Sequence, residues 1–183
     1  DISQDYSVAA TITPVDSKTS IGRQIISLNS DEIQTITTEW KGIQTWDCEN
    51  PNLYTLKLEL INPQKQIVHI HEERIGFSTI EFRPKDGIYV NGTKIIVKGT
   101  NRHSFHPDGG RTTNRELSLQ DALLIKEMNM NAVRSHYPPD KHFLEICDSL
   151  GIFYLNELAG WQNSYDTETG LKLLCKMINR DVN

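Results

Sequence analysis

The sequence predicts two parts of different fold class: an all-β part, followed by an α/β part in which strands and helices alternate. Up to about Phe82, short stretches alternate apolar and polar residues with period two, and no stretch shows a helical period. After the polar segment 83–87, short apolar strands instead alternate with stretches of helical period. We therefore expect one domain in residues 1–82 and a second in residues 83–183.

Four candidate strands make up the first part. In the third, Leu56, Leu58 and Leu60 alternate with polar residues, so one face of this strand is expected to be solvated. Residues 62–65 have the composition of a turn that leads into the fourth. The strands are expected at residues 6–12, 21–28, 55–60 and 67–75. Short antiparallel strands at this spacing are typical of a small immunoglobulin-like β-sandwich.

The second part opens with a β-hairpin, because Asn91-Gly92 between two apolar runs suits a two-residue type I′ turn. A polar loop is expected over residues 98–113. Ser118 is expected to cap the helix that follows, with Asp121 in its first turn.

Further strands and helices then alternate to the end of the sequence. Asp140 is expected to cap a second helix, and Gly151 to end it in the left-handed conformation. The remaining strands are expected at residues 131–134 and 152–155, and a third helix at residues 171–178. This alternation implies parallel strands joined by right-handed crossovers, in an open α/β sheet or a barrel.

Ionisable residues follow three successive strands of the second part. Residues 101–103 (Asn-Arg-His) come after the first strand, Arg134 and His136 after the second, and Glu157 after the third. Open α/β sheets and barrels both build their sites at the carboxyl ends of their strands. We therefore expect His103, Arg134, His136 and Glu157 to gather at one rim.

The composition is that of an ordinary globular protein, with 37% hydrophobic and 23% charged residues. The net charge of −5 argues against nucleic acid or an anionic membrane as the main partner. No run approaches the ~20 apolar residues of a membrane span, and the first residues do not resemble a signal peptide. Cys48, Cys147 and Cys175 are spaced for neither a disulfide framework nor a metal site.

A rim of Arg, His and Glu suits a polyhydroxylated or anionic ligand, and Trp161 would add an aromatic face for a sugar ring. A structural interpretation stands beside this one: Arg134 pairs with Glu157, and Trp161 only packs at the rim. His103 and His106 lack a third ligand for zinc, so no metal is expected there. Phosphate-loop and serine-nucleophile patterns are missing as well.

Long ordered motifs carry a resemblance to the family 2 glycoside hydrolases, the β-galactosidases, β-glucuronidases and β-mannosidases. In chain order these are VKGTNRHSFHP, MNMNAVRSHYPP and FLEICDSLGIFYLNE. ENPNLYTL and ERIGFSTIEF are also similar to the family's sandwich and to its junction with the barrel. The resemblance covers the chain from about Trp46 onward.

The resemblance implies an immunoglobulin-like sandwich in residues 1–82, and the first part of a (β/α)₈ barrel, about three βα units, in residues 83–183. It also implies retaining hydrolysis of β-glycosides, most of all β-galactosides, by two glutamates. By the family's pattern both glutamates would lie beyond Asn183, so we expect this segment alone to be inactive. Glu157 matches a supporting glutamate of the family.

The family's pattern also assigns roles to individual residues of this sequence. His103 and His136 match histidines that contact the sugar, and Arg134 matches the arginine that organises the catalytic carboxylates. One residue, Ser135, stands between Arg134 and His136, where the family usually has two. If the strand stays regular, Arg134 and His136 share a face, whereas a bulge or an early strand end would restore the usual geometry.

The segment after Glu157 departs from the magnesium-binding β-galactosidases, since residues 158–163 contain neither Glu nor His. We therefore expect no metal and no cofactor. Three βα units cannot close a barrel that needs ~250 residues, so we expect the segment to be a piece of a longer protein. The open sheet should make it self-associate into homo-oligomers or leave its last helix partly disordered.

Two other functions compete with the glycosidase interpretation. A non-catalytic carbohydrate-binding or adhesion module would use the sandwich as its working part and bind sugar on its own. A structural scaffold would instead lock the rim residues in buried ion pairs. The expected partner is a carbohydrate, a β-galactoside or a related β-glycoside.

Overall fold

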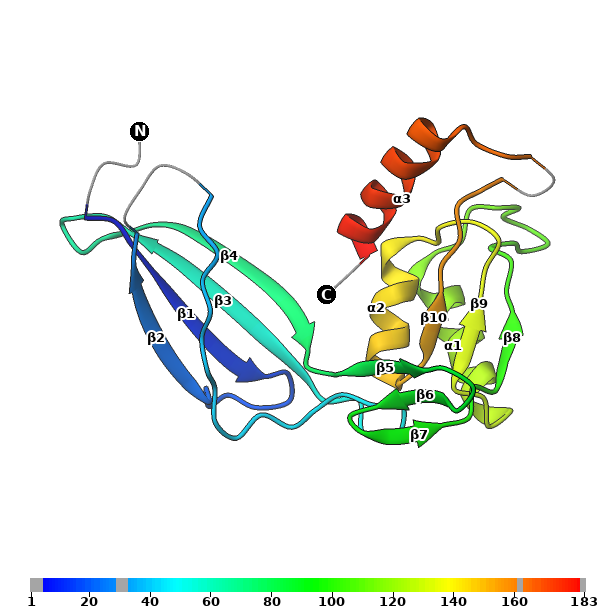
Figure 1. The fold of residues 1–183 in the computed structure, drawn as a ribbon, viewed down its shortest axis with the longest axis horizontal. Coiled ribbons are helices and arrows are strands. Elements are labelled where there is room, and N and C mark those ends of the chain that lie inside the picture. Colours follow the sequence, from blue (N-terminus) through cyan, green and yellow to red (C-terminus); the bar gives the residue numbers. More distant parts are fainter. Residues whose placement is uncertain (1–4, 29–32, 161–162, 182–183) are drawn as a thin grey trace. The chain divides into compact units, whose positions relative to one another are not determined.

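The computed structural model describes residues 5–28, 33–160 and 163–181. The chain divides into two compact units, one of Asp1–Thr45 with Asn52–Phe77, and one of Trp46–Pro51 with Ser78–Asn183 (Figure 1). The short segment Trp46–Pro51 belongs to the second unit because the indole Nε1 of Trp46 donates to the carbonyl of Asp148 at 2.7 Å. Among the described residues, no helix has the length and apolar character that a membrane crossing requires.

The first unit contains one antiparallel sheet of four strands in the order β2-β1-β3-β4 (Figure 1). The strands are β1 (Ser7–Pro14), β2 (Gly22–Ser27), β3 (Leu53–Ile61) and β4 (Ile67–Gly76). All four predicted strands are therefore confirmed, with shifts of a few residues at their ends. The turn before β4 closes through a hydrogen bond from Lys65 N to Asn62 O at 2.9 Å, as its composition indicates.

A small buried core lies on this sheet. Its apolar members are Ala9, Ala10, Ile12 and Tyr54. Glu59 is also buried, and its carboxylate meets Arg23 at 3.0 Å and Lys57 at 2.9 Å. The hydrogen bond from Lys57, together with the one from Arg23, lowers the pKa of Glu59 below its ordinary value of 4.5.

The second unit begins with a small antiparallel sheet of β5 (Ile80–Arg83), β6 (Gly87–Val90) and β7 (Thr93–Ile95). The predicted hairpin is confirmed: Asn91 and Gly92 both have positive φ, 50° and 77°, as a type I′ turn requires.

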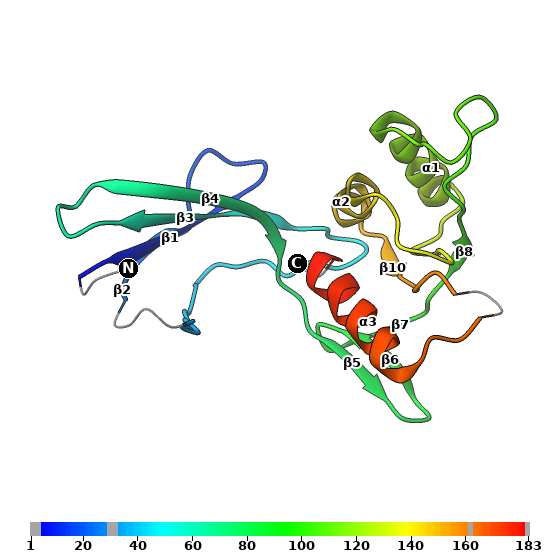
Figure 2. The ribbon, with the colours of Figure 1, turned by 90° about the horizontal axis from the view of Figure 1, so that it is seen from above.

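Three strand–helix units follow, and their strands are parallel in the order β10-β9-β8. The elements are β8 (Gly99–Asn101), α1 (Arg115–Glu127), β9 (Ala132–Arg134), α2 (Lys141–Leu150), β10 (Phe153–Leu155) and α3 (Thr167–Asp181). α1 and α2 cover one face of this sheet (Figure 2). The predicted parallel strands with helical crossovers are confirmed.

The main core of the second unit fills the space between the sheet and these two helices. Its buried members are Ala122, Ile125, Val133, Phe143, Ile146, Cys147 and Ile152. Gly99 lets β8 approach β9 closely, because a Cβ at this position would lie 2.8 Å from the carbonyl oxygen of Ala132. Gly151 ends α2 with φ of 67°, which confirms the predicted left-handed terminus.

The prediction that Ser118 caps the first helix is wrong. The first helix is capped by Asn114, whose side chain accepts from Leu117 N, whereas Ser118 is buried inside the helix. Ser118 instead makes a 3.0 Å hydrogen bond to His142 Nε2 on α2, so its hydroxyl joins two helices.

The first parallel strand also lies inside the segment expected to be a polar loop. Gly99–Asn101 is a strand because it pairs with Ala132–Arg134 of β9. Asp140 does precede α2, but its carboxylate accepts from Thr113 Oγ1 at 3.2 Å and makes no capping hydrogen bond. α3 runs further at both ends than its predicted range of 171–178.

Candidate functional site

The candidate site lies at the carboxyl ends of β8, β9 and β10. Asn101, Arg134 and Leu155 stand side by side across these three parallel strands, at the position where each strand ends. The side chains that follow them therefore meet at one edge of the sheet, as the sequence predicts.

Arg134 and His136 share one side of the chain at the end of β9. The Nη1 of Arg134 lies 3.4 Å from the Nε2 of His136, and the guanidinium forms an ion pair with Glu157 after β10. Ser135, between them, points the other way: it is buried, donates to the carbonyl of Tyr137 at 2.6 Å and accepts from the hydroxyl of Tyr154. The side-chain alternation of a strand thus continues past the strand end, and the short Arg-Ser-His spacing is accommodated in this way.

His103 reaches the same place from the loop after β8. Its ring stacks on that of His136, with centroids 4.9 Å apart and planes at 9°. The neighbouring Arg102 is buried, its Nε donates to Asp121 at 2.8 Å, and its guanidinium lies 4.0 Å from the ring centre of Phe143. Since Arg102 is tied to α1 and α2, it fixes the backbone from which His103 projects.

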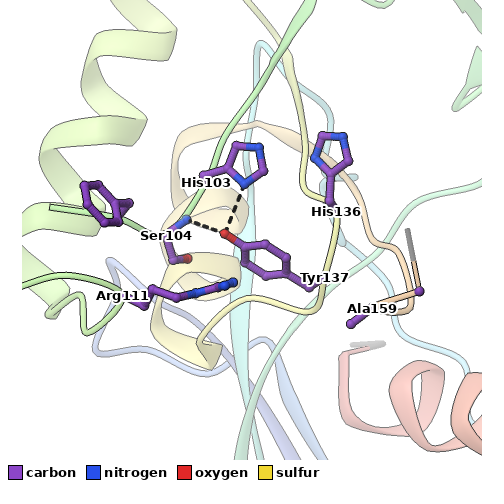
Figure 3. A pocket seen from close by; sticks show the side chains of 8 residues that line it. His103, Ser104, Arg111, His136, Tyr137 and Ala159 are labelled. Atoms are coloured by element: carbon purple, nitrogen blue, oxygen red, sulfur yellow. Dashed lines mark hydrogen bonds between the residues drawn. The ribbon is translucent and has the colours of Figure 1, made fainter. Parts of the chain in front are cut away.

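An open pocket of about 740 Å³ lies in front of the two histidines (Figure 3). Its lining residues are His103, Ser104, Phe105, Arg111, His136, Tyr137, Ala159 and Gly160. These eight include two imidazoles, a guanidinium, a phenol and a serine hydroxyl but no carboxylate. Such a lining combines aromatic surface with hydrogen-bonding groups, the combination that ligand pockets use.

Tyr137 joins two loops of this pocket. Its hydroxyl accepts from the backbone N–H of Ser104 at 3.1 Å and lies 3.2 Å from the Nδ1 of His103 (Figure 3). The guanidinium of Arg111 stands 4.6 Å from the centre of the Tyr137 ring.

The structure therefore brings four of the five predicted site residues together. His103 and His136 line the pocket, whereas Arg134 and Glu157 form an ion pair beside them, which is the contact that the structural interpretation anticipated. Trp161 lies outside the described residues. Sequence reasoning missed Tyr137 and Arg111, although Tyr137 stands next to His136 in the motif that carried the resemblance.

Two ionisable side chains near the core of the second unit, Cys147 and Tyr154, have raised pKa values. Burial raises the pKa of the Cys147 thiol and that of the Tyr154 hydroxyl to about 12 in each case. Both groups therefore stay protonated near neutral pH. In the part of the chain that the structure describes, no three His, Cys, Asp or Glu side chains are placed to hold a metal ion.

Comparison with known proteins places this chain in a family. Residues 81–178 match the family described as "Glycosyl hydrolases family 2, TIM barrel domain", and residues 1–77 match "Glycosyl hydrolases family 2". The chain belongs to glycosyl hydrolase family 2. Its fold class is therefore confirmed as the family's β-sandwich followed by the first part of the (β/α)₈ barrel.

The similar proteins are named either β-galactosidase or β-glucuronidase. The chain is 40% identical over 149 residues to a β-galactosidase of Thermoanaerobacterium thermosulfurigenes, covering 78% of this chain and 20% of that protein. It is 34% identical over 148 residues to a putative β-glucuronidase of Formosa agariphila, covering 78% of this chain and 18% of that protein. It thus spans about a fifth of the length of these relatives.

A solved structure shares the fold over nearly the whole chain. A glycosyl hydrolase family 2 member from Bacteroides cellulosilyticus superposes with a TM-score of 0.81 at 23% identity, covering 97% of this chain and 25% of that one. At this identity the likeness concerns the fold alone.

Proposed function

We propose that the chain is part of a retaining β-glycosidase that hydrolyses terminal β-galactosides. The observation that carries the proposal is the pocket at the ends of β8 and β9, where His103 and His136 stand stacked beside a phenol and a guanidinium. Neutral and charged hydrogen-bond donors with an aromatic surface suit a sugar ring. The β-galactosidase name of a relative at 40% identity favours galactose over glucuronic acid.

Within this proposal the predicted residues take different roles. His103 and His136 contact the sugar directly. Arg134 organises the carboxylates of the site and holds Glu157 in an ion pair, so Glu157 supports the site and does not attack the sugar.

The two catalytic glutamates come from parts of the protein outside this sequence, and the chain as printed is inactive. The eight pocket residues include no carboxylate, and Glu157 is occupied by Arg134. Retaining hydrolysis needs two carboxyl groups ~5–5.5 Å apart, one as nucleophile and one as acid/base.

Hydrolysis of chromogenic sugars tests both statements. The complete protein should release nitrophenol from its β-galactoside faster than from its β-glucuronide, and the printed chain should release none. Faster hydrolysis of the β-glucuronide would contradict the proposed β-galactoside specificity. Activity of the printed chain that survives Glu157→Gln would contradict the inactive state.

The domain division and the oligomeric state are proposed as well. The sequence-based division proposes domains in residues 1–82 and 83–183, a boundary that falls inside β5 (Ile80–Arg83), whereas the first compact unit ends at Phe77. We expect residues 1–183 alone to self-associate through β8 and β10, the outer strands of the described parallel sheet. Light scattering of a dilute solution should then show species larger than a monomer. A monodisperse monomer would contradict self-association.

A further inference from the structure

The hydroxyl of Tyr137 lies between two groups of the loop that follows β8. The backbone N–H of Ser104 donates to it at 3.1 Å, and the Nδ1 of His103 lies 3.2 Å away (Figure 3). A phenol carries one hydrogen to donate and lone pairs to accept, and Ser104 occupies one of those lone pairs. The direction of the contact with His103 therefore depends on where the phenolic hydrogen goes.

His103 provides the acceptor that this hydrogen needs. Arg111 is the other polar side chain against Tyr137, and a guanidinium only donates. Among the described residues, no other acceptor contacts the hydroxyl, and an O–H that donates to the Nδ1 of His103 gives both groups a partner. An Nδ1 that accepts carries no hydrogen, and in a neutral imidazole the hydrogen then resides on Nε2.

The surrounding contacts keep this arrangement in place. The ring of His103 is stacked on His136, and the ring of Tyr137 lies beneath the guanidinium of Arg111. Arg102 fixes the loop backbone through Asp121.

We infer that Tyr137 is a positioning residue that holds His103 as the tautomer with its hydrogen on Nε2, so that Nε2–H donates to a hydroxyl oxygen of the sugar. In the described part of the chain Nε2 of His103 has no hydrogen-bond partner, and His103 is an exposed residue of the pocket wall. The inference rests on the proposed function for the identity of the ligand. The tautomer itself depends only on the contacts of Tyr137.

The stacked neighbour should carry the opposite tautomer. The Nε2 of His136 lies 3.4 Å from the Nη1 of Arg134, which only donates, so this nitrogen accepts. The hydrogen of neutral His136 then resides on Nδ1, which is buried and has no hydrogen-bond partner among the described residues. Of the two parallel rings, His103 therefore presents the N–H donor to a ligand.

Nitrogen-15 chemical shifts of the histidine rings, measured on the full printed chain, test the tautomer without any activity. We expect an unprotonated Nδ1 and a protonated Nε2 for His103, and a mixture of tautomers after Tyr137→Phe. Tyr89→Phe is the matched control, because it removes a hydroxyl that bonds Asp86 on the β5–β7 sheet, and it should leave the His103 shifts unchanged. A protonated Nδ1 in the unchanged chain, or shifts that Tyr137→Phe does not alter, would overturn the inference.

Kinetics of the complete protein test the consequence for the sugar. Tyr137→Phe should raise KM for a β-galactoside about 3- to 10-fold, the effect of one neutral hydrogen bond, and change kcat less. In a His103→Ala background the same substitution should raise KM no further, because Tyr137 acts through His103. An equal rise of KM in both backgrounds would mean that Tyr137 acts through its hydrogen bond to the backbone of Ser104 and not through His103, and would overturn the inference. If the complete protein hydrolyses no β-galactoside, the proposed function fails, while the nitrogen-15 shifts still decide the tautomer.

Discussion

The two units of the chain obtain stability in opposite ways. The sheet of the first unit has strands of 6 to 10 residues, yet few of its apolar side chains are buried. The parallel strands of the second unit have 3 residues each, but two helices cover them and bury a contiguous core. Backbone pairing thus dominates the first unit and side-chain packing the second, and the pocket stands on the packed one.

The largest expected loss of stability follows from a substitution in the core of the second unit. Phe143 is 1% exposed, contacts the core cluster and carries the guanidinium of Arg102 on its ring. Phe143→Ala should lower the free energy of unfolding by about 3–5 kcal/mol, because it removes apolar contacts and leaves a cavity.

Urea unfolding followed by hydrogen exchange can assign this loss to β8–β10 and their helices. Phe82→Ala is the control, since Phe82 is 76% exposed, and it should cost far less. Equal costs for the two variants would contradict the packing account of the second unit.

The first unit should respond less to the same kind of change. Ile12 on β1 is 2% exposed, and Ile12→Ala should cost about 2–3 kcal/mol, the low end for buried Ile, because fewer buried side chains surround it. Ile25→Ala on β2, where Ile25 is 62% exposed, is the control in the same sheet. If Ile12→Ala cost as much as Phe143→Ala, the difference between the units would disappear.

The end of α2 tests backbone constraint in the second unit. Gly151 has φ of 67°, and a Cβ there would lie 2.5 Å from the carbonyl oxygen of Cys48. Gly151→Ala should cost about 2 kcal/mol, from the left-handed conformation and the contact with backbone atoms together.

Gly110→Ala separates these two causes, because Gly110 has φ of 58° and a Cβ added to it would meet nothing within 4 Å. Thermal unfolding should show a smaller loss for Gly110→Ala than for Gly151→Ala. The opposite order would mean that the backbone around Cys48 shifts at little cost to make room for the added Cβ of residue 151.

The smallest expected effect is the pH dependence of the first unit. The pKa of Glu59 is lowered in the folded chain, so its ion pairs with Lys57 and Arg23 stabilise the sheet above its ordinary value of 4.5, and the stabilisation is lost as pH falls further. Both partners are partly solvated, so the contribution should be about 1 kcal/mol.

Glu59→Gln should therefore reduce the pH dependence of the free energy of unfolding between neutral pH and pH values below 4.5. Denaturant unfolding at a series of pH values measures this dependence. Glu39→Gln, at an exposed residue of the same unit, is the control and should leave the pH profile as it is. A profile that Glu59→Gln leaves unchanged would place the titrating group elsewhere.

Features that depend on one or two residues could be predicted from the sequence. Asn91-Gly92 determines the hairpin turn and Gly151 the end of α2, because each requires a positive φ that few residues adopt. The meeting of His103, Arg134, His136 and Glu157 follows from the rule that parallel strands end at one edge.

Features that depend on partners distant in sequence were missed. Gly99–Asn101 has neither apolar residues nor a detectable period, and it becomes a strand only through its pairing with β9. Ser118 belongs to a residue type that often caps helices, but Asn114 caps α1, and Ser118 forms a hydrogen bond with His142 on α2. Tyr137 was missed because its contacts with His103 and Ser104 join two loops that only the fold brings together.

The kinetics of His136→Ala in the complete protein test the central claim most directly, namely that the strand ends of β8 and β9 hold the sugar. We predict a loss in kcat/KM on a nitrophenyl β-galactoside of about tenfold or more, the equivalent of ~1.4 kcal/mol of lost transition-state contact. His69→Ala, at an exposed residue of β4, is the control and should leave kcat/KM unchanged. An unchanged kcat/KM after His136→Ala, in a protein that does hydrolyse the galactoside, would contradict the account.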